Sequence, residues 1–448
     1  MGAAAQEPGG ESYSRREQRG WYFYDWANSA FYTTVVTLFL GPYLTGLAGA
    51  AARGGYVYPL GARIAAASVW PFTISISVMT QVLALPLFGA IADYGRRKRE
   101  MLAALAYIGS LATAAMYWLS GDRYLLGVAL FLVANLAFGA SIVIYNSFLP
   151  EIASAEDRDA VSSKGWGIGY LGGGLLLAAN LALYSKAAAL GIGEGQAVRI
   201  SLLSAGVWWA GFTLIPLRAI RNRGPRKLLA PGEGYFSTGV RQLRHTLSKA
   251  RQYPQTLLFL VAYLIYNDGI QTVITMSAQF GAGELHLSMG PLATAVLIAQ
   301  FVAFFGALLF NVLARVMGSR RAVMLGLGAW ILLLLYIYFE LRTVAQFYAM
   351  AAAIGTILGG TQALSRSIYS LMIPKGQEAE YFSMYEISDK GTSWLGPVCF
   401  GLAIQLTGSY RLAILSLVLF FVIGLALLTR LDVRRAAIEA GNEPPARG

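Results

Sequence analysis

Residues 20–44 read GWYFYDWANSAFYTTVVTLFLGPYL, an apolar run that is long enough to cross a membrane as one helix. The run nevertheless carries Asp25 and Asn28 in its first half. A carboxylate inside a bilayer costs several kcal/mol, so an acidic residue at this depth needs a partner or a function. The stretch therefore predicts an integral membrane protein with a polar site inside the membrane.

The composition supports this interpretation. The chain has 448 residues, of which 56% are hydrophobic and 13% are charged, whereas soluble domains carry about 25% charged residues. The single cysteine, Cys399, excludes an internal disulfide framework. The polar residues before the first apolar run, and the length of that run, argue against a cleaved signal peptide.

Apolar runs of roughly 20 residues, the length of a membrane-spanning helix, recur about twelve times along the chain. They predict an all-α integral membrane fold with twelve transmembrane helices. The runs lie near 21–48, 68–92, 101–120, 124–149, 165–190, 199–218, 255–280, 288–313, 322–340, 344–373, 381–407 and 411–430.

The basic residues predict the orientation of these spans. With the N-terminus in the cytoplasm, 26 of the 35 Lys and Arg residues fall on the cytoplasmic side, seven on the other side and two inside spans. Such a bias places both termini in the cytoplasm. Because the basic residues behind the net charge of +12 lie mostly in cytoplasmic loops and tails, they are explained by membrane topology, and nucleic acid is not an expected partner. Lysine is scarce relative to arginine, which hints at a GC-rich prokaryote and hence a bacterial cytoplasmic membrane.

A polar stretch at 221–253 divides the chain into six spans and six. Within it, Val240, Leu243 and Leu247 share one helical face, which fits a helix on the inner membrane surface and equally a solvated linker helix. The expected parts are a cytoplasmic tail at 1–20, a six-helix bundle at 21–220, the central loop at 221–253, a second six-helix bundle at 254–430 and a cytoplasmic tail at 431–448.

Three short matches indicate that the two bundles are copies of one unit. SSKG at 162–165 matches SDKG at 388–391, GRRK at 95–98 matches GSRR at 318–321, and Pro150 matches Pro374, all at offsets near 224. Parallel repeats of this kind predict two pseudo-symmetric bundles. The third, sixth, ninth and twelfth spans lack charged residues in their middles, so we expect them to face lipid.

Polar residues spaced i, i+3, i+4 and i+7 form one stripe on each of spans 1, 7 and 10, and span 11 adds further charged residues. Stripes on cognate helices predict a solute and proton pathway between the bundles. Its expected residues are Asp25, Asn28, Tyr32, Asn267, Asp268, Gln271, Gln362, Arg366, Tyr369, Tyr385, Glu386, Asp389 and Lys390.

A purely structural role for these groups remains open. Arg366 could form an ion pair with Glu386 or Asp389, and Asp25 could cap the N-terminus of its helix. Asp268 lies near the middle of span 7, where transporter substrate and ion sites usually lie. Four acids face two bases in this set, so an acid without a basic partner could exchange a proton with the solution.

Glycines at 165–174 include a G-x-G-x-x-G pattern, but a dinucleotide fingerprint needs a preceding strand, and this one lies in a membrane span. We interpret Gly165, Gly169 and Gly173 as a helix-packing face. Ala351, Gly355, Gly359 and Ala363 form a second such face in span 10. Neither histidine has neighbouring metal ligands in the sequence, and no nucleophilic triad is evident, so no metal, cofactor or enzymatic activity is expected.

GAIADYGRRKR at 89–99, between spans 2 and 3, resembles the signature loop of the major facilitator superfamily. Gly89, Asp93, Gly95, Arg96, Arg97 and Lys98 occupy the positions of that motif. The resemblance implies a loop that latches the inner gate. In such a loop the aspartate interacts with the start of span 11, and the basic groups interact with neighbouring helices. The second copy, GSRR, lacks the aspartate.

More narrowly, YDWANSAF (24–31), YNDGIQTVI (266–274), GGTQALSRSIYS (359–370) and EYFSMYEISDKGTSWLGP (380–397) resemble the fungal vacuolar amino-acid effluxer subfamily and its bacterial relatives. The resemblance implies export of a small solute, with amino acids the best-known substrates. We therefore expect a monomeric, proton-coupled secondary transporter of a polar or zwitterionic solute, surrounded by membrane lipid. The alternatives are a lipid flippase and a non-transporting receptor or scaffold; the lack of a sizeable soluble domain disfavours a scaffold.

Overall fold

The computed structural model describes residues 14–94, 97–152, 158–222, 237, 252–372, 385 and 394–442. Most of the central loop predicted at 221–253, with its amphipathic helix, lies outside the described residues.

The N-terminal half begins with one continuous helical rod. Its three parts are α1 (Arg15–Ala30), the π-helix η1 (Phe31–Phe39) and α2 (Leu40–Ala51). The long helices that follow are α3 (Val69–Tyr94), α4 (Lys98–Ala115), α5 (Tyr124–Ser147), α7 (Arg158–Ser185) and α8 (Glu194–Ala219). Short elements connect them: β1 (Tyr56–Val57), η2 (Pro59–Gly61), β2 (Ile64–Ala65), η3 (Ala66–Ser68), η4 (Met116–Trp118) and α6 (Leu149–Ile152).

The C-terminal half contains only helices among its described residues. The long ones are α10 (Pro254–Glu284), α11 (Met289–Met317), α12 (Ser319–Phe339) and α13 (Val344–Leu371). They are followed by α15 (Leu395–Thr407), the nearly continuous pair α16 (Tyr410–Ser416) and α17 (Val418–Thr429), and the short α18 (Val433–Glu439).

Ten of the described helical segments are long and apolar enough to cross a membrane, and two shorter apolar helices cover Met289–Ala303 and Leu395–Thr407. The twelve places coincide with the twelve predicted runs, and the stretch at Met289–Ala303 belongs to α11, which continues to Met317. The predicted all-α membrane fold is confirmed. The first span starts earlier than predicted, at Arg15, because a polar turn precedes its apolar part.

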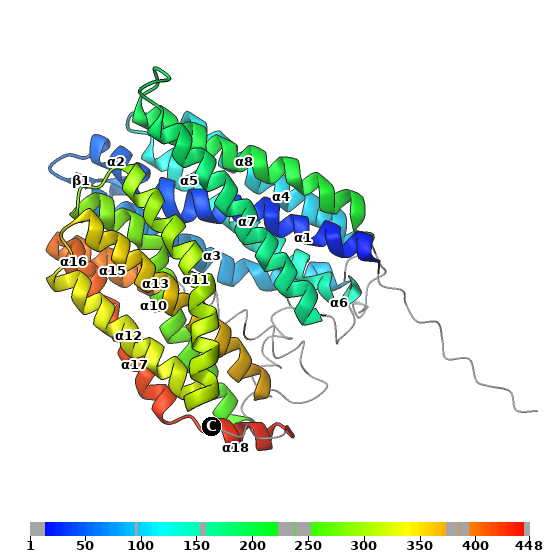
Figure 1. Ribbon diagram of the computed structural model, residues 1–448. Helices are drawn as coiled ribbons and strands as arrows, with labels where there is room; N and C mark the ends of the chain where they lie inside the picture. The colour runs from blue at the N-terminus through cyan, green and yellow to red at the C-terminus, as the bar shows by residue number, and fades with distance from the viewer. Residues whose placement is uncertain are drawn as a thin grey trace, which may run out of the picture.

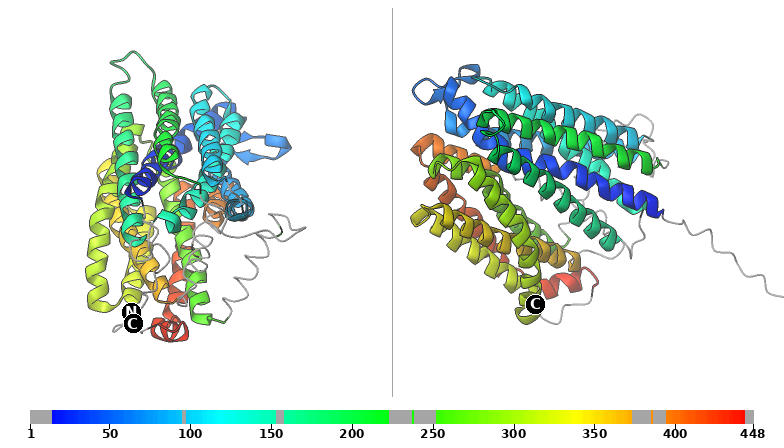
Figure 2. Two further views of the ribbon diagram at one scale, coloured as in Figure 1. Left: turned by 90° about the vertical axis from the view of Figure 1, so that its right-hand side faces the viewer. Right: turned by 45° about the horizontal axis from the view of Figure 1, so that its top comes forward.

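The two halves meet at one end and diverge at the other. In Figures 1 and 2 the N-terminal helices (blue to green) and the C-terminal helices (light green to red) come together near β1 and α15 and separate toward α6 and α18. Within the first half, α1 packs between α7 and α8, and α4 packs against α5 and α8. Within the second, α13 packs against α11 and α12, and α10 packs against α17.

Hydrogen bonds between the halves gather at the end where they meet. Gln279 donates to the carbonyl oxygen of Ala67 at 2.6 Å, Ser68 donates to that of Gly401 at 3.0 Å, and Gln405 accepts from the Ala65 amide at 2.7 Å. These bonds join η3 and β2, which lie between α2 and α3, to α10 and α15. They hold this end of the molecule closed.

Glycines allow α1 and α7 to touch. A Cβ atom at Gly165 would lie 2.9 Å from Oδ2 of Asp25, and one at Gly169 would lie 2.8 Å from Oγ of Ser29. A Cβ atom at Gly173 would lie 3.0 Å from the Thr33 side chain. These contacts confirm the packing face predicted for span 5. In span 10, Gly355 packs against the backbone of α11.

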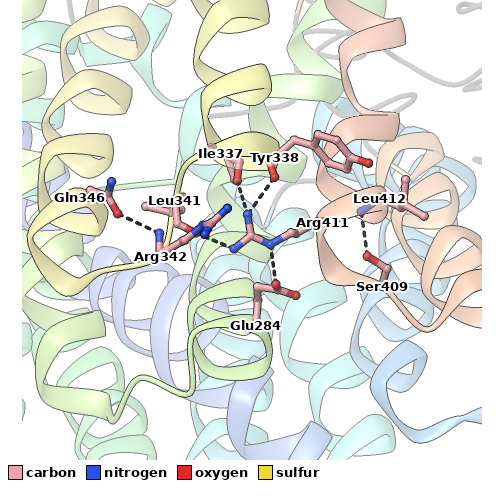
Figure 3. Close-up of polar contacts among 9 residues, drawn as sticks. All are labelled: Glu284, Ile337, Tyr338, Leu341, Arg342, Gln346, Ser409, Arg411 and Leu412. Carbon is pink, nitrogen blue, oxygen red and sulfur yellow. Dashed lines mark hydrogen bonds and ion pairs between the residues drawn. The ribbon is translucent and has the colours of Figure 1, made fainter.

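Arg411 joins three helix ends of the C-terminal half (Figure 3). Its Nε atom lies 2.6 Å from Oε1 of Glu284, at the end of α10. Its other nitrogens donate to the carbonyl oxygens of Ile337 and Tyr338, in the last turn of α12, and of Leu341, just after that helix. One guanidinium group thereby fixes the start of α16 against α10 and α12.

Candidate functional site

Asp25 lies inside the N-terminal half, where α1, α5 and α7 meet. Its Oδ2 atom accepts a hydrogen bond from the hydroxyl of Tyr145 at 2.9 Å. The Tyr145 ring stacks on Trp21 with centroids 4.2 Å apart, and the Trp21 indole donates to the Tyr145 carbonyl oxygen. Because α1 begins at Arg15, Asp25 lies more than two turns into the helix, and the interpretation of Asp25 as a helix cap is wrong.

Asn28 and Tyr32 continue the stripe along the helical rod. Asn28 is 3% exposed, and its Nδ2 atom has no hydrogen-bond partner among the described residues. Tyr32 lies in η1 and donates to Oε1 of Gln271 at 3.1 Å. This bond connects the predicted stripe of the first half directly to the predicted stripe of the second.

Asp268 is the most buried acid of the described pathway residues, with 1% of its surface exposed. Its Oδ2 atom accepts from the backbone amide of Gly396, at the start of α15, at 3.0 Å. Its Oδ1 atom has no hydrogen-bond partner within the described part of the chain. The ion pairs that the described residues form do not include it. Within the described part of the chain, this carboxylate in a membrane helix is thus held by a backbone amide and not by a cation.

Gly396 is a site residue that the sequence interpretation missed. A Cβ atom there would lie 3.0 Å from Oδ1 of Asp268 and would overlap the Thr272 side chain. Thr272 in turn donates to the backbone carbonyl of Asp268 at 2.7 Å. The close approach of α15 to the stripe of α10 therefore requires glycine at this position.

The two halves build their stripes in the same way. The stripe of α1 and η1 repeats in α10 at a constant offset of 243, since 268 − 25, 271 − 28, 272 − 29 and 275 − 32 are equal. In each half the aspartate also packs against a glycine of the fifth helix, Gly169 in α7 and Gly396 in α15. The constant offset was a signal in the sequence that could have identified the two aspartates as equivalent positions.

The described residues of α13 lie in an aromatic cluster. Tyr369 is buried and stacks with Tyr385 at 5.2 Å between centroids, and Tyr385 stacks on Tyr263 at 4.3 Å. Gln362 is half-buried, and Asn267 is buried beside Asp268.

Several predicted residues lie outside the described residues. They are Gly95, Arg96, Glu386, Asp389 and Lys390, together with the side chains of Asp93 and Arg366 and the surroundings of Gly89. The predicted ion pair of Arg366 therefore stays a prediction. In the gating loop, Arg97 is exposed. Lys98 forms an ion pair with Glu151 at 2.9 Å, with side chains 6% and 2% exposed, which joins the start of α4 to α6 in the same half.

The described residues contain no group of three or more His, Cys, Asp and Glu side chains that could hold a metal ion. The described side chains of the stripes in α1, η1 and α10 offer carboxyl, amide and hydroxyl groups. Such groups can bind a polar solute and can exchange protons.

Comparisons with known proteins identify the family to which the chain is similar over nearly its full length. A family model described as "Vacuole effluxer Atg22 like" matches residues 13–441. The "Uncharacterized MFS-type transporter YxiO" of Bacillus subtilis (strain 168) is 30% identical over 415 residues, covering 92% of this chain and 94% of that protein. "Autophagy-related protein 22" of Gibberella zeae is 27% identical over 532 residues, covering 96% of this chain and 81% of that protein.

Solved structures show the same fold. A D-xylose-proton symporter aligns with a TM-score of 0.67 at 12% identity, covering 92% of this chain and 97% of that one. The nucleoside transporter NupG aligns with a TM-score of 0.64 at 12% identity, covering 93% and 98%. These relatives and neighbours are transporters and not enzymes. The chain belongs to the vacuole effluxer Atg22-like family, and it is a multi-pass membrane transporter with the major facilitator fold.

Proposed function

We propose that this protein is a secondary active transporter that moves a small polar or zwitterionic solute, such as an amino acid, by alternating access. The observation that carries the proposal is Asp268, a carboxylate that is 1% exposed deep in a membrane helix and accepts a hydrogen bond from the backbone amide of Gly396. A charge at such a place is expensive, and it marks a pathway for solute or protons when no cation balances it.

The proposed solute site lies where the two stripes meet, at Tyr32 and Gln271. Their hydrogen bond links the two halves, and the buried Asn28 lies one helical turn before Tyr32 on the same stripe. Hydroxyl and amide groups recognise polar solutes by hydrogen bonds that fix their orientation. Tyr369 would reach a solute only after its aromatic cluster opens.

We propose Asp268 as the proton carrier and Asp25 as an entry or gating group. The Oδ1 atom of Asp268 accepts no hydrogen bond from the described residues, so it could take up a proton or accept a hydrogen bond from a solute. Asp25 already accepts a hydrogen bond from a tyrosine hydroxyl, which holds its side chain in place and suits a fixed role. Protonation would remove the charge of Asp268 and lower the cost of closing the halves around it.

We place the protein in a bacterial cytoplasmic membrane, with both termini in the cytoplasm and transport directed outward. The distribution of basic residues supports the orientation, and the description of the family supports efflux. In this orientation the closed end is the outer one, and the described conformation faces inward. Asp93 would latch the inner gate in the opposite state, and Arg366 would pair with Glu386 or Asp389.

The experiment that tests the proposed function is a solute screen in proteoliposomes, run with and without a pH gradient. Radiolabelled amino acids are the first solutes, sugars and nucleosides are the comparison, and a fluorescent phospholipid tests lipid movement in the same vesicles. We expect one amino-acid class to accumulate only when the gradient is present. Movement of the phospholipid without any solute would support a flippase in its place.

A further inference from the structure

A basic cavity opens at the end of the N-terminal half where the two halves diverge. Its volume is about 590 Å³. We call it the arginine pocket, and its lining residues are Arg16, Arg99, Glu100, Ala103, Leu217 and Arg218. They come from the starts of α1 and α4 and from the end of α8. Three guanidinium groups against one carboxylate leave the pocket positive.

The carboxylate of the pocket is already engaged. Oε1 of Glu100 lies 3.2 Å from Nη2 of Arg99, and Oε2 accepts from Nδ2 of Asn222 at 2.6 Å. The backbone amide of Arg99 donates to Oδ1 of Asn222 at 2.8 Å, which closes the network. Arg16 and Arg218 form no ion pair or hydrogen bond with other described residues through their side chains. Two positive charges therefore remain for a ligand.

The frame of the pocket is rigid. At Gly20, one turn after Arg16, α1 approaches α8 so closely that a Cβ atom would overlap the side chain of Ala219. Oε1 of Glu17 accepts from the backbone amide of Arg221, which ties the start of α1 to the chain after α8. Arg16 and Arg218 are thus carried on neighbouring helix ends that are held in contact.

The pocket also borders the lipid-facing surface. Ile108 and Leu111 on α4, and Val207 and Leu214 on α8, are large apolar side chains exposed on candidate membrane spans. Ala103 and Leu217 continue this apolar surface into the pocket wall. An acyl chain can lie along the spans while its headgroup reaches the arginines.

We infer that the arginine pocket binds the phosphate headgroup of an anionic phospholipid in the adjacent leaflet. Guanidinium groups bind phosphate oxygens through paired donors, and basic pockets between transmembrane helices suit anionic headgroups. A zwitterionic headgroup gains less, because its own ammonium group is repelled by Arg16 and Arg218. The lipid would join α1, α4 and α8 at the membrane surface.

The test is native mass spectrometry of the purified full chain with phosphatidylglycerol or phosphatidylcholine added. The test variant carries Arg16→Gln and Arg218→Gln. The matched control carries Arg430→Gln and Arg434→Gln, which removes two exposed arginines from the other half. We expect the wild type and the control to retain one phosphatidylglycerol in preference to phosphatidylcholine. The test variant should lose about 30-fold in this preference, because each basic residue near the surface contributes a factor of about five.

Three results would overturn the inference. One is retention of phosphatidylglycerol by the test variant, and a second is an equal loss in the control. The third is displacement of the lipid by millimolar inorganic phosphate, which would identify a site for a free anion. Thermal unfolding of each variant checks its fold, and an Arg16→Lys, Arg218→Lys variant that keeps both charges should retain the lipid within about fivefold.

Discussion

At the scale of single residues, the proposed pathway contains two aspartates in equivalent positions with different partners. Asp25 accepts from a tyrosine hydroxyl, whereas Asp268 accepts from a backbone amide. Helical periodicity was enough to predict both stripes, because side chains that share a helix face are fixed by spacing. Gly396 could not be predicted in the same way, because its role depends on which neighbouring helix touches it.

The first prediction concerns Gly396→Ala. The new methyl group would meet Oδ1 of Asp268 at 3.0 Å and overlap Thr272, so α15 must move away from α10. Overpacking of this kind lowers the free energy of unfolding by about 1–3 kcal/mol. We expect a lower unfolding temperature in detergent and loss of solute transport, because the amide that holds Asp268 is displaced.

The matched control is Gly174→Ala in α7, where a Cβ atom would meet nothing within 4 Å. Alanine is favoured over glycine inside a helix by about 0.5–1 kcal/mol, so this variant should be as stable as the wild type or more so. If Gly396→Ala has the same unfolding temperature and the same transport rate as Gly174→Ala, α15 does not approach Asp268 as closely as described.

At the scale of elements, the apolar runs predicted where the helices lie but not how they are joined. The π-helix at Phe31–Phe39 and the β1–β2 hairpin were not predicted, because one extra residue per turn and two-residue strands leave no periodic signal. Arg411 was counted only as a basic residue of an outer loop. Its partners lie 70 or more residues away in the chain, so no local sequence pattern predicts them.

The second prediction concerns the junction at Arg411 in Figure 3. Arg411→Ala removes the ion pair to Glu284 and the donors to three carbonyl groups at and just after the end of α12. Because the Arg411 side chain is partly exposed, we expect the free energy of unfolding to fall by only about 2 kcal/mol. Thermal unfolding measures it against Arg342→Ala, which removes an exposed arginine nearby. Equal unfolding temperatures for the two variants would contradict the junction.

The third prediction concerns Lys98 and Glu151, which join α4 to α6. Lys98→Met would leave the Glu151 carboxylate buried without its lysine, at a cost of about 3–5 kcal/mol. Lys98→Met combined with Glu151→Gln should recover more than half of that loss. The control is Arg435→Met in an exposed pair with Glu439, where we expect a loss below about 1 kcal/mol. No recovery in the double variant would argue against a direct pair.

At the scale of the whole molecule, the described helices form two halves that touch at one end. The repeat was predicted from short matches at a common offset. The conformation was not, because an alternating-access transporter must encode at least two states in one sequence. Here η3 and β2 hold the closed end through Ser68 and Ala65, while the stripes meet at Tyr32 and Gln271.

The most direct test of the account compares counterflow with pH-gradient-driven uptake for Asp268→Asn and Asp25→Asn in proteoliposomes, using the solute found in the screen. Asparagine keeps the size of the side chain and removes the titratable proton. If Asp268 carries the coupled proton, Asp268→Asn should exchange solute at close to the wild-type rate yet fail to accumulate it under a gradient, and Asp25→Asn should slow both modes. Accumulation of solute against its gradient by Asp268→Asn would contradict the account and leave Asp268 a residue that only binds helices together.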